Sequence, residues 1–116
     1  WDEDTINLQK KVAEYSLAIL KEKTDKVAFF NFLTHITIHC DCMDKPYKPD
    51  IPDIGIMVSR DPVAVEKATI DMINLHTGRD YFRSIWPKID YTVQLEHAHE
   101  IGLGNLEYDL QTLEQA

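Results

Sequence analysis

A short apolar run followed by a helix-start signal constrains the fold of this chain more than any other feature. Residues 54–58 are apolar, as expected for a central strand. Asp61 and Pro62 follow closely, and aspartate as N-cap with proline at the first helical position is a typical start of a helix. Gly78 supplies the matching end signal. The sequence therefore predicts a strand joined to a helix over residues 54–78.

Periodicity and composition predict the other elements. Leu8, Val12, Tyr15 and Ile19 recur at helical spacing, so we expect them to form the buried stripe of a first helix. Valine, phenylalanine, isoleucine and threonine are enriched in the next segment, which favours a strand. The expected elements are a helix over about 5–23, a strand over 26–38, a short helix within 79–90, a helix over 91–101 and a final strand over 106–113.

Together these elements predict an α/β fold. Their order is α-β-β-α-α-β, which gives a small mixed sheet of about three strands with three to four packing helices. Pro46, Pro49 and Pro52 exclude a helix from the connection over 40–53. We expect one domain spanning residues 1–116.

Charge and composition exclude several classes of function. The net charge is -8 and the pI is about 4.9, whereas binding to nucleic acid or to an anionic membrane surface requires a basic patch. No apolar run reaches the about 20 residues of a membrane span, and no secretory signal is visible. The two cysteines are one residue apart, so they cannot staple distant segments. We therefore expect a cytoplasmic protein that binds neither nucleic acid nor membrane.

Several short motifs, taken in this order, are similar to those of one protein family. The chain resembles the uncharacterised iron–sulfur-centre proteins that carry domain of unknown function 362, and the resemblance covers about Lys11 to Leu113. The motifs are Cys40-Asp41-Cys42, Ile51-Pro52-Asp53-Ile54-Gly55-Ile56, Ser59-Arg60-Asp61-Pro62-Val63-Ala64, Val93-Gln94-Leu95-Glu96 and Ile101-Gly102-Leu103-Gly104.

The resemblance implies a larger parent protein. In this family a ferredoxin-like insert with cysteine-rich cluster motifs often precedes the matching region, which would put Trp1 directly after such an insert. This chain has no ferredoxin-type cysteine run, so iron–sulfur clusters are implied only for the missing upstream region. We expect the chain to be the C-terminal piece of a redox protein, serving as a structural and interaction segment or bordering the redox site of an oxidoreductase. Its partners are then the upstream part of the same protein and, through exposed apolar surface, further copies of itself as a homo-oligomer.

The sharpest group of chemistry-bearing residues lies in the segment 35–42, which reads His-x-x-x-His-Cys-x-Cys. Thiolate and imidazole ligands suit zinc or iron, and we expect this segment to be the end of a strand that opens into a loop. The spacing matches no standard zinc motif. The predicted metal ligands are Cys40, Cys42, His39 and His97, with His99 as the alternative to His97.

Two other interpretations of the cysteines stay open. They can be small structural thiols with the histidines on the surface, or a redox or nucleophilic thiol activated by a nearby His39, Lys45 or Arg60. The acidic residues around the strand–helix unit offer a weaker hypothesis of paired-carboxylate hydrolysis, in which Asp61 is more simply an N-cap. The residues concerned are Asp53, Asp61, Glu66 and Asp71.

Overall fold

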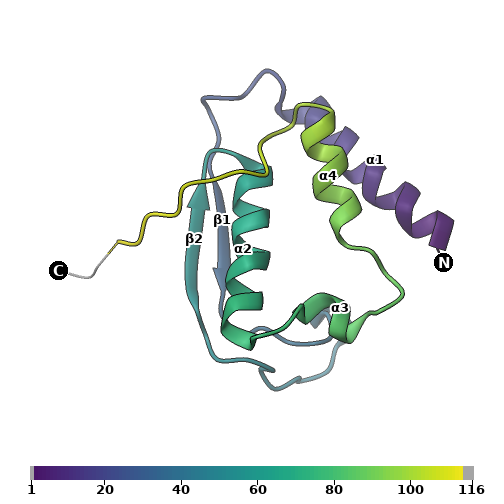
Figure 1. Ribbon diagram of the computed structural model, residues 1–116, viewed down its shortest axis with the longest axis vertical. Coiled ribbons are helices and arrows are strands. Elements are labelled where there is room, and N and C mark those ends of the chain that lie inside the picture. Colours follow the sequence, from purple (N-terminus) through teal and green to yellow (C-terminus); the bar gives the residue numbers. More distant parts are fainter. Residues whose placement is uncertain (1, 114–116) are drawn as a thin grey trace.

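A computed structural model describes residues 2–113 as a mixed α/β arrangement (Figure 1). Trp1, which the resemblance places directly after the insert, lies outside the described residues. No helix among the residues described is long and apolar enough to cross a membrane. The elements are α1 (Asp2–Leu20), β1 (Phe29–Leu33), the single 3-10 turn η1 (Asp41–Met43), β2 (Gly55–Ser59), α2 (Pro62–Thr77), α3 (Tyr81–Ile85) and α4 (Thr92–Glu100).

The two strands pair antiparallel, with Phe29 opposite Ser59 and Leu33 opposite Gly55. Helix α2 covers one face of this sheet (Figure 1). The strand predicted over 26–38 is shorter than expected, because His35 takes a left-handed φ of 51° that breaks the extended backbone just after β1.

The third strand predicted over 106–113 does not form within the part of the chain that the structure describes. The hydroxyl of Tyr108 donates a hydrogen bond to Asp71 of α2 at 2.7 Å. Leu106 packs against the helical core. These contacts hold the segment across α2, away from a position where it could pair with β1 or β2, and the chain then runs out past β2 (Figure 1).

The predicted strand–helix unit forms, but the prediction of a central strand is wrong, because β2 pairs only with β1 in the sheet that the structure describes. The Asp61 side chain accepts hydrogen bonds from the backbone N–H groups of Val63 and Ala64, both at 2.9 Å, so it caps α2. Gly78 ends the helix in the left-handed conformation, with φ of 67°, which glycine adopts without steric cost. The two signals that surround α2 in the sequence therefore fix both of its ends.

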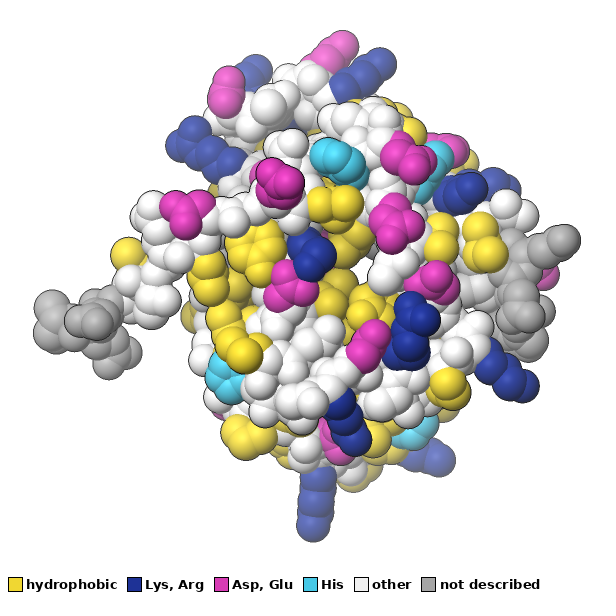
Figure 2. All heavy atoms as spheres, in the orientation of Figure 1, with side chains coloured by type: hydrophobic (Ala, Val, Ile, Leu, Met, Phe, Trp, Pro, Cys, Tyr) yellow, Lys and Arg dark blue, Asp and Glu magenta, His cyan; other side chains and the backbone are white. Residues whose placement is uncertain are grey.

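The buried residues form two clusters on either side of α2. Figure 2 shows hydrophobic side chains gathered in the middle of the viewed face, between α2 and α4. One cluster joins α1, α2 and α4, and the other joins β1, α2 and α3. The first contains Ala13, Val63, Leu95 and Ala98, and the second contains Leu33, Ile73 and Tyr81.

Helix α1 forms as predicted, but the prediction of its buried stripe is wrong. Tyr15 is 72% exposed and Leu8 is 63% exposed, whereas Ala13, on the adjacent face, is only 2% exposed. The reason is that α1 packs against α4, on the side away from the sheet (Figure 1). The helical spacing was predicted correctly, but Ala13, a small residue beside the predicted stripe, makes the contact with α4.

Candidate functional site

The connection from β1 to β2 holds the predicted site residues, and its two ends are tied together. The backbone N–H of His35 donates to the Asp53 carboxylate at 2.7 Å, and the N–H of Asp50 donates to the Ile36 carbonyl at 2.8 Å. These bonds close the long connection at its base. The residues between them, including both cysteines, therefore form a compact loop at the end of the sheet.

A buried tyrosine anchors this loop to the helices. The Tyr81 hydroxyl donates to the Asp50 carboxylate at 2.8 Å. Burial, together with the hydrogen bond to Asp50 and its negative charge, raises the pKa of Tyr81 to about 12. The phenol therefore stays protonated, and keeps its role as donor, throughout the physiological range.

Cys40 and Cys42 lie in a tight turn, which corrects the expectation that they emerge from the end of a strand. The N–H of Met43 donates to the Cys40 carbonyl at 3.2 Å, which closes η1. The N–H of Cys42 donates to the Cys40 Sγ at 3.3 Å. Both cysteines are exposed. Asp44, immediately after the turn, has a left-handed φ of 51°, as His35 does.

His39 lies against two aromatic rings beside a hollow. Its ring centroid is 5.0 Å from that of Tyr47 and 6.3 Å from that of Trp86, which meets it edge-on. His39, Cys40 and Tyr47 are among the residues that line an open hollow of about 750 Å³. The other lining residues are Phe32, Thr34, His35, Ile36, Thr37, Ile38, Lys45 and Pro46. The structure thus brings His39 and Cys40 to one surface, as the sequence suggested.

The other histidine proposed as a ligand is engaged elsewhere. His97 lies on α4, where its Nε2 is 3.0 Å from the Glu14 carboxylate of α1 and its Nδ1 is 3.8 Å from that of Glu100. His99 has its Nδ1 2.9 Å from the Gly104 carbonyl. Both histidines therefore contact groups that lie next to α4, and neither reaches the cysteines through the contacts described.

The described residues contain no group of three or more histidine, cysteine, aspartate or glutamate side chains placed to hold a metal ion. The geometry near the cysteines does not assemble the four-ligand centre of zinc or iron that the sequence suggested. The site at Cys40, Cys42, His39 and His97 stays a prediction, and metal analysis of purified protein would test it.

The acidic residues of the strand–helix unit have structural partners. The Asp61 carboxylate, besides capping α2, accepts from the backbone N–H of Asn105 at 2.8 Å and from its side chain at 3.1 Å. Asp71 binds Lys67 at 2.6 Å and accepts from Tyr108, whose pKa is raised to about 12 by burial and by this bond. Sequence reasoning identified the cap and missed its second role, which joins the α2 start to the segment after α4.

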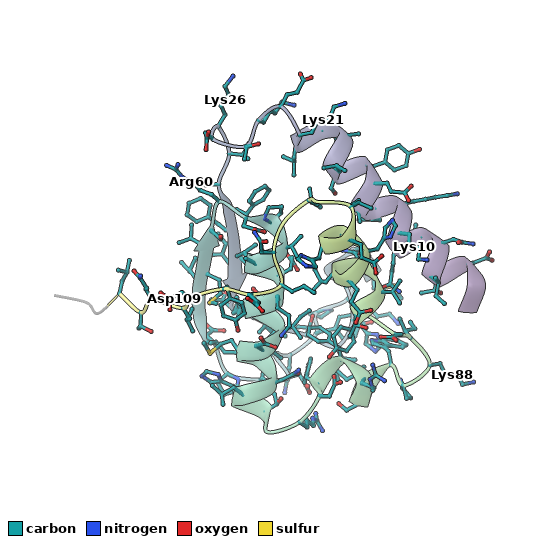
Figure 3. All side chains as sticks on the ribbon, turned by 45° about the horizontal axis from the view of Figure 1, so that its top comes forward. Lys10, Lys21, Lys26, Arg60, Lys88 and Asp109 are labelled. Carbon is teal, nitrogen blue, oxygen red and sulfur yellow. The ribbon has the colours of Figure 1, made fainter. Side chains whose placement is uncertain are left out.

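A further hollow of about 360 Å³ opens at the start of α2. Lys21, Arg60 and Asp61 are among its lining residues, and Figure 3 shows Lys21, Lys26 and Arg60 at the same end of the molecule. The N-terminus of α2 attracts negative charge through its dipole. The Asp61 carboxylate already occupies that position, so this end of the helix is satisfied from within the chain.

One face of the sheet carries large apolar side chains that no described element covers. Phe30 lies opposite Val58 and Phe32 lies opposite Ile56, and these four side chains are 57–64% exposed. Aromatic and branched side chains in directly opposed pairs stabilise a sheet. Their alternation with the inward-facing residues was present in the sequence, but the prediction of a buried strand did not distinguish the two faces.

Comparison with known proteins identifies one family. The family described as Domain of unknown function (DUF362) matches residues 2–71. No curated protein and no solved structure matches the chain. The match covers α1, both strands, the cysteine turn and the first part of α2.

Proposed function

We propose that this chain, which belongs to the DUF362 family, is a structural and interaction segment of an iron–sulfur-associated redox protein. The uncovered sheet face then binds the upstream part of the same polypeptide. That upstream part would hold the iron–sulfur clusters, because this chain has two cysteines and a cluster of the ferredoxin type needs four.

The observation that carries the proposal is the sheet face formed by Phe30, Phe32, Ile56 and Val58. Each buried square ångström of apolar surface contributes roughly 25 cal/mol, so two phenylalanines and two branched residues represent several kcal/mol of unrealised burial. Antiparallel sheets often leave one face to solvent, but that face is then polar, whereas the free face of this sheet carries four large apolar side chains. Helix α2 covers one face of this sheet, and the opposite face supports docking onto a further layer of protein.

A second apolar surface lies on α1. Four of its exposed apolar residues are those of the stripe predicted from the sequence, Leu8, Val12, Tyr15 and Ile19. Contiguous apolar surfaces of this kind mark sites of protein–protein contact. When the upstream part is absent, copies of the chain have the same surfaces to cover, and we therefore expect a homo-oligomer.

Substitution of Phe32 by glutamate tests the proposal. A charge at the centre of the sheet face should weaken self-association of the chain at least about tenfold, measured by sedimentation at several concentrations. The upstream part, produced as a separate chain, should bind the wild type and not Phe32→Glu. The matched control is Leu75→Glu, since Leu75 is an exposed apolar residue on α2.

Two results would contradict the proposal. One is a wild-type chain that stays monomeric at high concentration and does not bind the upstream part. The other is equal weakening by Phe32→Glu and Leu75→Glu, which would mean that any added negative charge disperses this acidic chain.

A further inference from the structure

We infer that Cys40 and Cys42 form a redox-active dithiol, in which Cys40 attacks an external disulfide and Cys42 then closes an intramolecular disulfide. One residue separates the two cysteines, which lie in a tight turn, and both are exposed. The inference stands without the proposed function, because it concerns chemistry within the connection between β1 and β2, although Phe32 of the sheet face also lines the hollow.

The turn holds the two cysteines close together. Disulfides join residues whose Cα atoms are about 4.4–6.8 Å apart. Cys40 directly precedes η1 and Cys42 lies in its middle, and because a 3-10 turn advances only about 2 Å per residue, the two positions stay near each other. The N–H of Cys42 already points to the Cys40 Sγ, at 3.3 Å. This contact shows that the backbone at position 42 and the sulfur at position 40 face each other.

The two cysteines are not equivalent, and the difference assigns their roles. Cys40 is among the residues that line the hollow of about 750 Å³, and Cys42 is not. Cys40 is therefore the attacking residue and Cys42 the resolving one.

The lining of the hollow indicates the class of substrate. It supplies the ammonium group of Lys45 and the hydroxyl groups of Thr34 and Thr37, while none of its lining residues is acidic. In a chain with net charge -8, such a lining favours an anionic molecule. The inferred substrate is a small disulfide that carries carboxylates, for which oxidised glutathione is the probe.

The reaction balances in two exchanges. The Cys40 sulfur attacks one sulfur of the external disulfide, which forms a mixed disulfide and releases the first thiol. The Cys42 sulfur then attacks Cys40 at the mixed disulfide, forming the Cys40–Cys42 bond and releasing the second thiol. The protein dithiol loses two electrons and two protons, and the external disulfide gains both to become two thiols.

Mass spectrometry of the intact chain in glutathione buffers tests this inference. After treatment with a chelator, the wild type should lose two hydrogens as oxidised glutathione is added and regain them as reduced glutathione is added. Cys42→Ser should stop at the mixed disulfide on Cys40. Cys40→Ser should react at least about tenfold more slowly, because Cys42 lies outside the hollow. In urea the two single variants should react at similar rates.

Each of three results would overturn the inference. The wild type could accumulate glutathione on both cysteines without an internal disulfide. The two single variants could react at equal rates in the folded protein. Finally, the chain could retain stoichiometric zinc or iron that blocks both thiols, in which case the cysteines are metal ligands. Cys40→Ser and Cys42→Ser each change an exposed side chain, so both variants should fold as the wild type does.

Discussion

Helices α1 and α2 both contain many apolar residues, yet they have different positions in the molecule. Helix α2 lies between the sheet and α4, and it contributes Val63 to one buried cluster and Ile73 to the other. Helix α1 packs mainly against α4, and the apolar stripe predicted for it is exposed. The apolar residues of a helix in the sequence therefore do not show by themselves which helix lies at the centre of the fold.

The contacts that hold the two helices also differ in kind. The start of α2 is fixed by the Asp61 cap and its sides by apolar packing. Helix α1 is held by the small side chain of Ala13 and by polar contacts at its edge, in which Gln9 donates to the Asp90 carbonyl at 2.9 Å and Glu14 meets His97. Buried apolar contacts contribute more than exposed polar ones. The comparison therefore predicts a well-anchored α2 and a loosely attached α1.

The same substitution made in both helices tests most directly whether α2 is anchored more firmly than α1. Ile73 is 4% exposed and Ile19 is 61% exposed. Ile73→Ala should lower the free energy of unfolding by about 2–5 kcal/mol, because it leaves a cavity beside Leu33 and Tyr81. Ile19→Ala should change it by less than about 0.5 kcal/mol. Urea denaturation of the two variants at a concentration where the chain is monomeric would measure both values, and equal losses would contradict the comparison.

A smaller effect is expected where the segment after α4 meets the start of α2. A Cβ placed on Gly104 would lie 2.1 Å from Asp61 Oδ1 and 2.8 Å from its Cγ. Gly104→Ala must therefore displace the carboxylate that caps α2 and binds Asn105, and we expect a loss of about 1–3 kcal/mol.

Thermal denaturation of Gly104→Ala should show this loss, and Asp61→Ala in the same background should show whether it acts through the cap. If the displaced carboxylate is the cause, the two substitutions should cost less together than the sum of their separate costs. Full additivity would mean that the strain at position 104 lies elsewhere.

The fold could be predicted from the sequence where local signals decide the structure. Asp61, Pro62 and Gly78 determine the ends of α2 through hydrogen bonding and backbone conformation within a few residues. The prediction of a final strand over 106–113 was wrong because long-range contacts, and not local signals, determine the position of that segment. The alternation of Leu106, Tyr108 and Leu110 is typical of a strand, but pairing needs a neighbouring edge, and the long-range bond from Tyr108 to Asp71 places the segment elsewhere.

The candidate site was predicted in part. Proximity in the sequence was enough to bring His39 and Cys40 to one hollow. The tight turn at the cysteines was missed, since it depends on left-handed backbone at His35 and Asp44 that the residue types do not specify. The position of His97 depends on how α4 packs against α1, which periodicity does not reveal.

The smallest expected effect tests how α1 is attached. Glu14 Oε1 and His97 Nε2 are 3.0 Å apart at the edge of the contact between α1 and α4. With the imidazole protonated, a double-mutant cycle with Glu14→Gln and His97→Asn should give a coupling of about 0.2–1 kcal/mol. This coupling should weaken as salt is added, because the carboxylate of the pair is 57% exposed and ions screen it. Glu22→Gln, on the exposed segment just after α1, is the control for a general effect of charge. A coupling above about 2 kcal/mol would show that polar contacts anchor α1 as firmly as apolar packing anchors α2, and the distinction between the two helices would then fail.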